Sequence, residues 1–80
     1  MDIKVLGSGC ANCKALEART RAVLDDLGVV APIEKVTDFA DIAGYGVMTT
    51  PALVIDGEVV LAGRVPPVAD LVAIIERATA

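Results

Sequence analysis

Two cysteines near the start of the sequence have the clearest capacity for chemistry. Cys10 and Cys13 are separated by Ala11 and Asn12, and they are the 2 cysteines of the chain. A thiol pair at this spacing can close a disulfide within one helical turn, or it can bind a soft metal ion through two thiolates. The chain has no histidine, which excludes a Cys–His catalytic pair.

The residues around the cysteines favour thiol–disulfide exchange. A thiol attacks a disulfide as the thiolate, so the attacking cysteine needs surroundings that stabilise negative charge. Cys10 follows Gly7-Ser8-Gly9 and precedes a predicted helix, whose free N–H groups and dipole would stabilise an anion. We therefore predict that Cys10 is the attacking nucleophile and Cys13 the resolving thiol.

The composition limits the kind of protein. Residues 1–80 suffice for a single domain, and 55% of them are apolar. A net charge of −4 and the near absence of aromatic residues argue against nucleic acid and anionic lipid as partners. The N-terminus does not resemble a secretory signal, and no apolar run is long enough for a membrane span. The cytoplasm is therefore the expected compartment, where a cysteine pair is more often catalytic or metal-binding than structural.

Hydrophobic periodicity and turn residues predict the element order β-α-β-α-β-β-α. Strands are expected at residues 3–6, 32–36, 52–55 and 59–61, and helices at residues 12–27, at residues 38–42 and after the Pro66-Pro67 pair. Gly28 should end the first helix, and Asp56-Gly57 should form a hairpin turn. Because a helix joins the first two strands and a hairpin joins the last two, the sheet should be mixed.

A second motif, Met48-Thr49-Thr50-Pro51, stands directly before the most apolar strand. Together with the cysteine motif after the first strand, it resembles the thioredoxin and glutaredoxin superfamily, and most closely its small redox-active disulfide proteins. The resemblance covers residues 5–13, residues 45–57 and Gly63. It implies a thioredoxin-like α/β fold with a four-stranded mixed sheet of order 2-1-3-4 flanked by three helices.

The resemblance also implies how the site works. The Thr50–Pro51 bond would be cis and would lie beside the dithiol, and the backbone of Thr50 would pair with an extended substrate segment. The activity would be thiol–disulfide oxidoreduction, with no cofactor besides the disulfide of the protein itself. The partners would be a disulfide-containing protein or small molecule and a recycling reductase, and the chain would act as a monomer. The other residues implied to contact substrate surround the cysteines, namely Gly9, Ala11 and Asn12.

Several features depart from the larger thioredoxins or leave alternatives open. The Ala11-Asn12 pair stands where the larger thioredoxins have Gly-Pro. Because this dipeptide differs among proteins of different redox potential, the resemblance does not predict the potential of this chain. Asp38, Asp56 and Lys14 are candidates for a group that assists Cys13. The remaining large side chains near the second motif, Tyr45 and Met48, are expected to pack in the core or at its rim.

Two other classes of function compete with the redox hypothesis. The same cysteines would suit a carrier of copper or a metalloid, although such carrier domains end on a strand and this chain is predicted to end on a helix. A pure interaction module with inert cysteines is the third possibility.

Overall fold

The computed structural model describes residues 2–7 and 9–79 and has the predicted order of elements. The bounds are β1 (Ile3–Leu6), α1 (Ala11–Leu27), β2 (Ile33–Val36), α2 (Phe39–Gly44), β3 (Ala52–Ile55), β4 (Glu58–Ala62) and α3 (Val68–Thr79). The four strands form one sheet in the order β2-β1-β3-β4. β1 pairs in parallel with β2, whereas β3 is antiparallel to both of its neighbours. The predicted mixed sheet of order 2-1-3-4 is confirmed.

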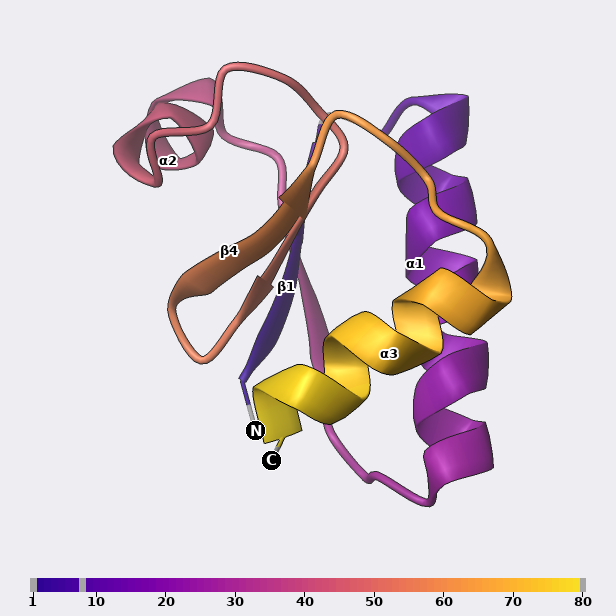
Figure 1. Ribbon diagram of the computed structural model, residues 1–80. Helices are drawn as coiled ribbons and strands as arrows, with labels where there is room; N and C mark the ends of the chain where they lie inside the picture. The colour runs from indigo at the N-terminus through magenta and orange to yellow at the C-terminus, as the bar shows by residue number, and fades with distance from the viewer. Residues whose placement is uncertain (1, 8, 80) are drawn as a thin grey trace.

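The helices cover the two faces of the sheet unequally (Figure 1). α1 and α3 lie on one face, where Ile3 and Val5 of β1 join the larger core cluster with side chains of both helices. Leu6 points to the other face and packs in a smaller cluster with Ile42 of α2. Because successive side chains of β1 point to opposite faces of the sheet, the strand contributes to two core clusters. The short helix α2 covers the second cluster.

Local signals set the ends of the elements. Gly28 ends α1 in a left-handed conformation, and its N–H bonds the Asp25 carbonyl oxygen at 3.1 Å. Asp56 and Gly57 both have positive φ, at 51° and 83°, between β3 and β4, as expected of a tight hairpin. The Asp38 side chain caps α2 by accepting a hydrogen bond from the Ala40 N–H at 2.8 Å.

The packing of the large side chains near α2 differs from expectation. Tyr45 is half-buried as predicted, but Met48 is 95% exposed, so its predicted role in the core or rim was wrong. Phe39 is 84% exposed. The helix that covers this face of the sheet, α2, has 6 residues and is too short to bury both of these side chains. Among the described residues, no helix has the length and apolar character needed to cross a membrane.

Candidate active site

The two cysteines lie at the N-terminus of α1. Cys10 is the N-cap residue, with extended backbone angles, and its Sγ accepts a hydrogen bond from the Cys13 N–H at 3.1 Å. The Cys10 carbonyl oxygen accepts the Lys14 N–H at 3.0 Å. A disulfide joins the two cysteines, whose Cα atoms are 5.0 Å apart. Cys10 Sγ therefore sits where the helix dipole and unpaired N–H groups stabilise negative charge.

The two sulfur-bearing residues differ in access to solvent. Cys10 is exposed, whereas Cys13 retains only 5% of its surface. A bulky disulfide can approach Cys10 from outside, but it cannot reach Cys13 without a rearrangement of the protein.

Gly7, which follows β1, lies directly against the side chain of Cys13. Its N–H donates to the Val36 carbonyl oxygen at 2.9 Å, which holds this turn against β2. A Cβ atom at Gly7 would overlap the Cys13 Sγ, and it would lie 3.8 Å from the Thr50 Cβ. The missing side chain therefore lets the backbone approach both Cys13 and Thr50 closely.

The second motif lies beside the same turn. The Thr50–Pro51 peptide bond is cis, Thr50 is exposed and Pro51 is buried. The Pro51 carbonyl oxygen accepts the N–H of Gly63 at 2.8 Å, which ties the motif to the end of β4. The structure thus brings Thr50 to the cysteine pair, although the two motifs are far apart in the sequence.

The other predicted residues divide into two groups. Gly9, Ala11 and Asn12 are exposed around Cys10, on the side from which a partner would approach. Asp38 is committed to capping α2, and Asp56 accepts a hydrogen bond from the Asp2 N–H at 2.8 Å. Asp56 follows the end of β3 opposite Pro51, so it is remote from the cysteines.

A small cavity beside Cys13 is lined by Lys14, which the sequence singled out, and by two charged residues that it did not, Glu17 and Lys35. The cavity has a volume of about 50 Å³, and its lining includes Cys13, Lys14, Glu17 and Lys35. Glu17 Oε2 and Lys35 Nζ form an ion pair at 3.1 Å. The spacing of four residues from Cys13 to Glu17 was an available signal, because residues i and i+4 share a helix face.

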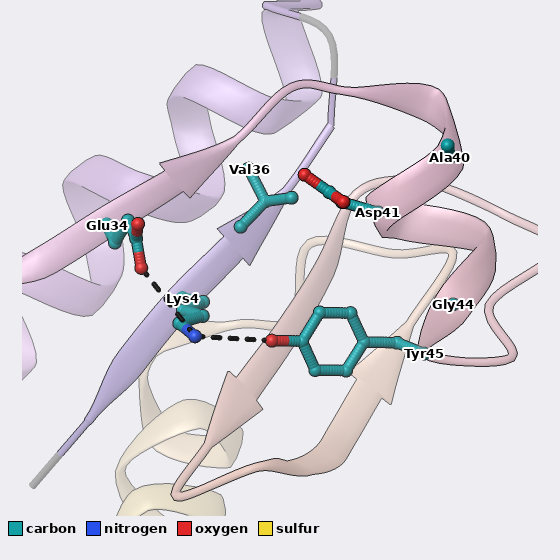
Figure 2. A pocket seen from close by; sticks show the side chains of 7 residues that line it. All are labelled: Lys4, Glu34, Val36, Ala40, Asp41, Gly44 and Tyr45. Atoms are coloured by element: carbon teal, nitrogen blue, oxygen red, sulfur yellow. Dashed lines mark hydrogen bonds and ion pairs between the residues drawn. The ribbon is translucent and has the colours of Figure 1, made fainter.

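A larger hollow of about 410 Å³ lies between the sheet and α2 (Figure 2). Lys4 Nζ donates to the Tyr45 hydroxyl at 3.3 Å and pairs with Glu34 Oε2 at 3.7 Å. The hydrogen bond with Tyr45, aided by the charge of Asp2, raises the pKa of Lys4 above its ordinary value. Neither cysteine lines this hollow, and we assign it no part in the redox site.

Within residues 2–7 and 9–79, no group of three or more His, Cys, Asp or Glu side chains is placed to hold a metal ion.

Comparison with known proteins gives consistent matches. A family model described as a thioredoxin domain matches residues 1–76. A thioredoxin of Methanothermobacter thermautotrophicus is 40% identical over 65 residues, which cover 81% of this chain and 84% of that protein. A thioredoxin of Methanocaldococcus jannaschii is 33% identical over 69 residues, covering 86% of this chain and 79% of that protein.

Proposed function

This chain belongs to the thioredoxin domain family and is a thiol–disulfide oxidoreductase, and we propose that it works by cycling Cys10 and Cys13 between dithiol and disulfide. The observation that carries the proposal is the contrast between the two cysteines. Cys10 is exposed at the N-terminus of α1, and the buried Cys13 is bonded to it.

The reaction has two steps in the reducing direction. The Cys10 thiolate attacks one sulfur of a substrate disulfide, forms a mixed disulfide and releases the other substrate sulfur as a thiolate. Cys13 then attacks Cys10 Sγ, which closes the protein disulfide and releases the second substrate thiolate. The substrate gains two electrons and the cysteine pair loses them, so no further cofactor is needed.

We propose that the substrate is a polypeptide disulfide rather than only a small one. The exposed residues Gly9, Ala11 and Asn12 would contact it near Cys10, and the backbone of Thr50, ahead of Pro51, would pair with an extended segment. A groove of about 420 Å³ next to Thr50 supports this, because its lining includes the exposed apolar residues Phe39 and Met48. Exposed apolar surface of this kind suits a protein partner.

The chain would act as a monomer in a reducing compartment such as the cytoplasm, and a separate reductase would restore the dithiol. Neither membrane nor nucleic acid would be a partner, since both favour basic proteins and this chain carries a net charge of −4.

An equilibrium redox titration in dithiol buffers tests the central proposal. We expect one two-electron transition, read as the fraction of free thiols by alkylation and mass, in the wild-type protein. In a separate buffer of oxidised and reduced glutathione, a monothiol, Cys13→Ser should accumulate a mixed disulfide with glutathione, and Cys10→Ser should not, because Cys13 is buried. A wild-type protein that forms no internal disulfide under mild oxidation, but binds monovalent copper tightly, would overturn the proposal in favour of a metal carrier.

A further inference from the structure

Met48 places a thioether sulfur in the lining of the groove next to Thr50. The groove has a volume of about 420 Å³, and its lining combines the buried residues Ile42 and Val47 with the exposed residues Phe39 and Met48. Thr50 belongs to the same lining, so the groove reaches the segment that lies beside the cysteine pair. A chemical change at Met48 therefore alters the surface that a polypeptide substrate would contact.

The Met48 side chain is open to oxidants from solvent. The residue is 95% exposed, and an accessible methionine is readily oxidised to its sulfoxide. Cys13, by contrast, keeps 5% of its surface. In the disulfide form the two cysteine sulfurs are bonded to each other, so neither is a thiolate that an oxidant can attack. In that form Met48 supplies the accessible oxidisable sulfur of the site.

The exposure of Met48 also determines what its oxidation does. A sulfoxide disrupts a protein core, because it turns an apolar side chain into a polar one. Met48 lies outside both core clusters, so the fold should persist. In the groove, however, the sulfoxide must lose its water when an apolar substrate side chain packs against it, and this desolvation costs free energy. The expected result is weaker substrate binding with unchanged chemistry at Cys10.

We propose that Met48 is an oxidation site, and that its conversion to the sulfoxide by a peroxide weakens the binding of polypeptide substrates. This inference rests on the proposed function, because it concerns the regulation of the same site. It gives the exposed thioether of the groove a role that the cysteine pair does not require.

The oxidation step can be written with hydrogen peroxide as the oxidant. Met48 Sδ attacks one peroxide oxygen, so that an S–O bond forms while the O–O bond breaks. The sulfur loses two electrons and becomes a sulfoxide. The second oxygen leaves as hydroxide and takes the proton of the first, which yields water.

Peroxide treatment of the disulfide form, followed by rate measurements with two kinds of disulfide, tests the inference. The peroxide is removed, peptide mapping by mass spectrometry locates the added oxygen, and the cysteines are then reduced with dithiothreitol, which is removed in turn. The sulfoxide survives this step, because its reversal requires a methionine sulfoxide reductase. Second-order rate constants are measured for insulin, a polypeptide disulfide, and for a small symmetric aromatic disulfide.

The treated wild-type protein should discriminate between the two substrates. We expect an added oxygen on Met48 and a rate constant for insulin that falls about 10-fold, since the loss of a methionine contact weakens association by about this factor. The rate constant for the aromatic disulfide should stay unchanged, because it reports the attack by Cys10. Urea midpoints before and after treatment should agree, because Met48 is not part of the core.

Two variants assign the effect to Met48. Met48→Leu keeps an apolar side chain that peroxide does not oxidise, so its rate constant for insulin should be the same before and after treatment. The chain has 2 methionines, so Met1 remains as the internal control for oxidation in this variant. Met48→Gln carries an uncharged polar side chain of similar length, and it should show the lowered rate constant for insulin without any peroxide.

The outcomes are distinguishable. The role of Met48 is contradicted if no oxygen is found on it, if the treated wild type keeps its rate constant for insulin, or if Met48→Leu loses as much as the wild type. An equal fall with both disulfides also contradicts it, because oxidation would then act on the cysteines or on the fold. An untreated wild-type protein that reduces neither disulfide would instead contradict the proposed function.

Discussion

A methyl group at Gly7 should destabilise the protein more than a methyl group at Gly28, a glycine of positive φ that is surrounded by open space. Gly7 has φ +158° and Gly28 has φ +71°, both in the range that disfavours an L side chain. A Cβ at Gly28 would meet no atom within 4 Å, whereas a Cβ at Gly7 would overlap Cys13 Sγ and lie 3.2 Å from Cys13 Cβ. Gly7→Ala thus combines backbone strain with a steric conflict, and Gly28→Ala introduces strain alone.

The expected magnitudes follow from these two terms. Backbone strain, partly offset by the lower entropy of the unfolded chain, should reduce the unfolding free energy of Gly28→Ala by about 1 kcal/mol. Overpacking against the sulfur adds about 1–3 kcal/mol in Gly7→Ala. The total for Gly7→Ala is about 2–4 kcal/mol, a large part of the stability expected for a domain of this size.

Urea denaturation of the oxidised proteins measures both effects, with alkylation confirming that the disulfide is intact. We expect the midpoint of Gly7→Ala to fall well below that of Gly28→Ala, with similar slopes for the two variants. Equal losses of stability in the two variants would refute the reasoning, because they would mean that the Cys13 sulfur does not rest on the backbone of Gly7.

Two further predictions concern stability. Thr20 Oγ1 is buried without a hydrogen-bond partner among the described residues, so Thr20→Val should raise the free energy of unfolding by about 1 kcal/mol; a loss of stability in urea would contradict this. Because the pKa of Lys4 is raised, its stabilising effect should be present below the ordinary value of 10.5 and lost as the pH rises through the raised value. The stability difference between wild type and Lys4→Met should therefore be constant at lower pH and shrink as the pH rises above 10.5, and a difference that stays constant there would count against the interaction.

The features that the sequence predicted well depend on residues close together in the chain. Gly28 ends α1 because a left-handed residue closes the last turn, and Asp56-Gly57 turns the chain because both residues tolerate positive φ. The continuous apolar run 52–55 predicts a strand covered on both faces, and all four of its residues are buried. Such signals need no knowledge of the rest of the fold.

The exposure of Met48 and Phe39 could not be predicted in the same way. An apolar side chain is buried only if another element covers it, and the length of that cover is a property of the tertiary structure. The six-residue helix α2 leaves both side chains beside the groove next to Thr50. In the proposed function their apolar side chains serve as a binding surface, although the sequence first suggested the core or its rim for Met48.

Glu17 shows most clearly why the site was only partly predictable. From the sequence, it occupies the polar side of an amphipathic helix, where a solvated carboxylate is the usual outcome. Its partner Lys35 lies in β2, and the two meet only because the crossover from β1 through α1 makes β2 parallel to β1. The helix places Glu17 one turn from Cys13, and the parallel register of the sheet supplies the cation. A cysteine motif can thus identify the sulfur chemistry, but the charged pair that lines the cavity beside Cys13 becomes visible only when the strands are paired.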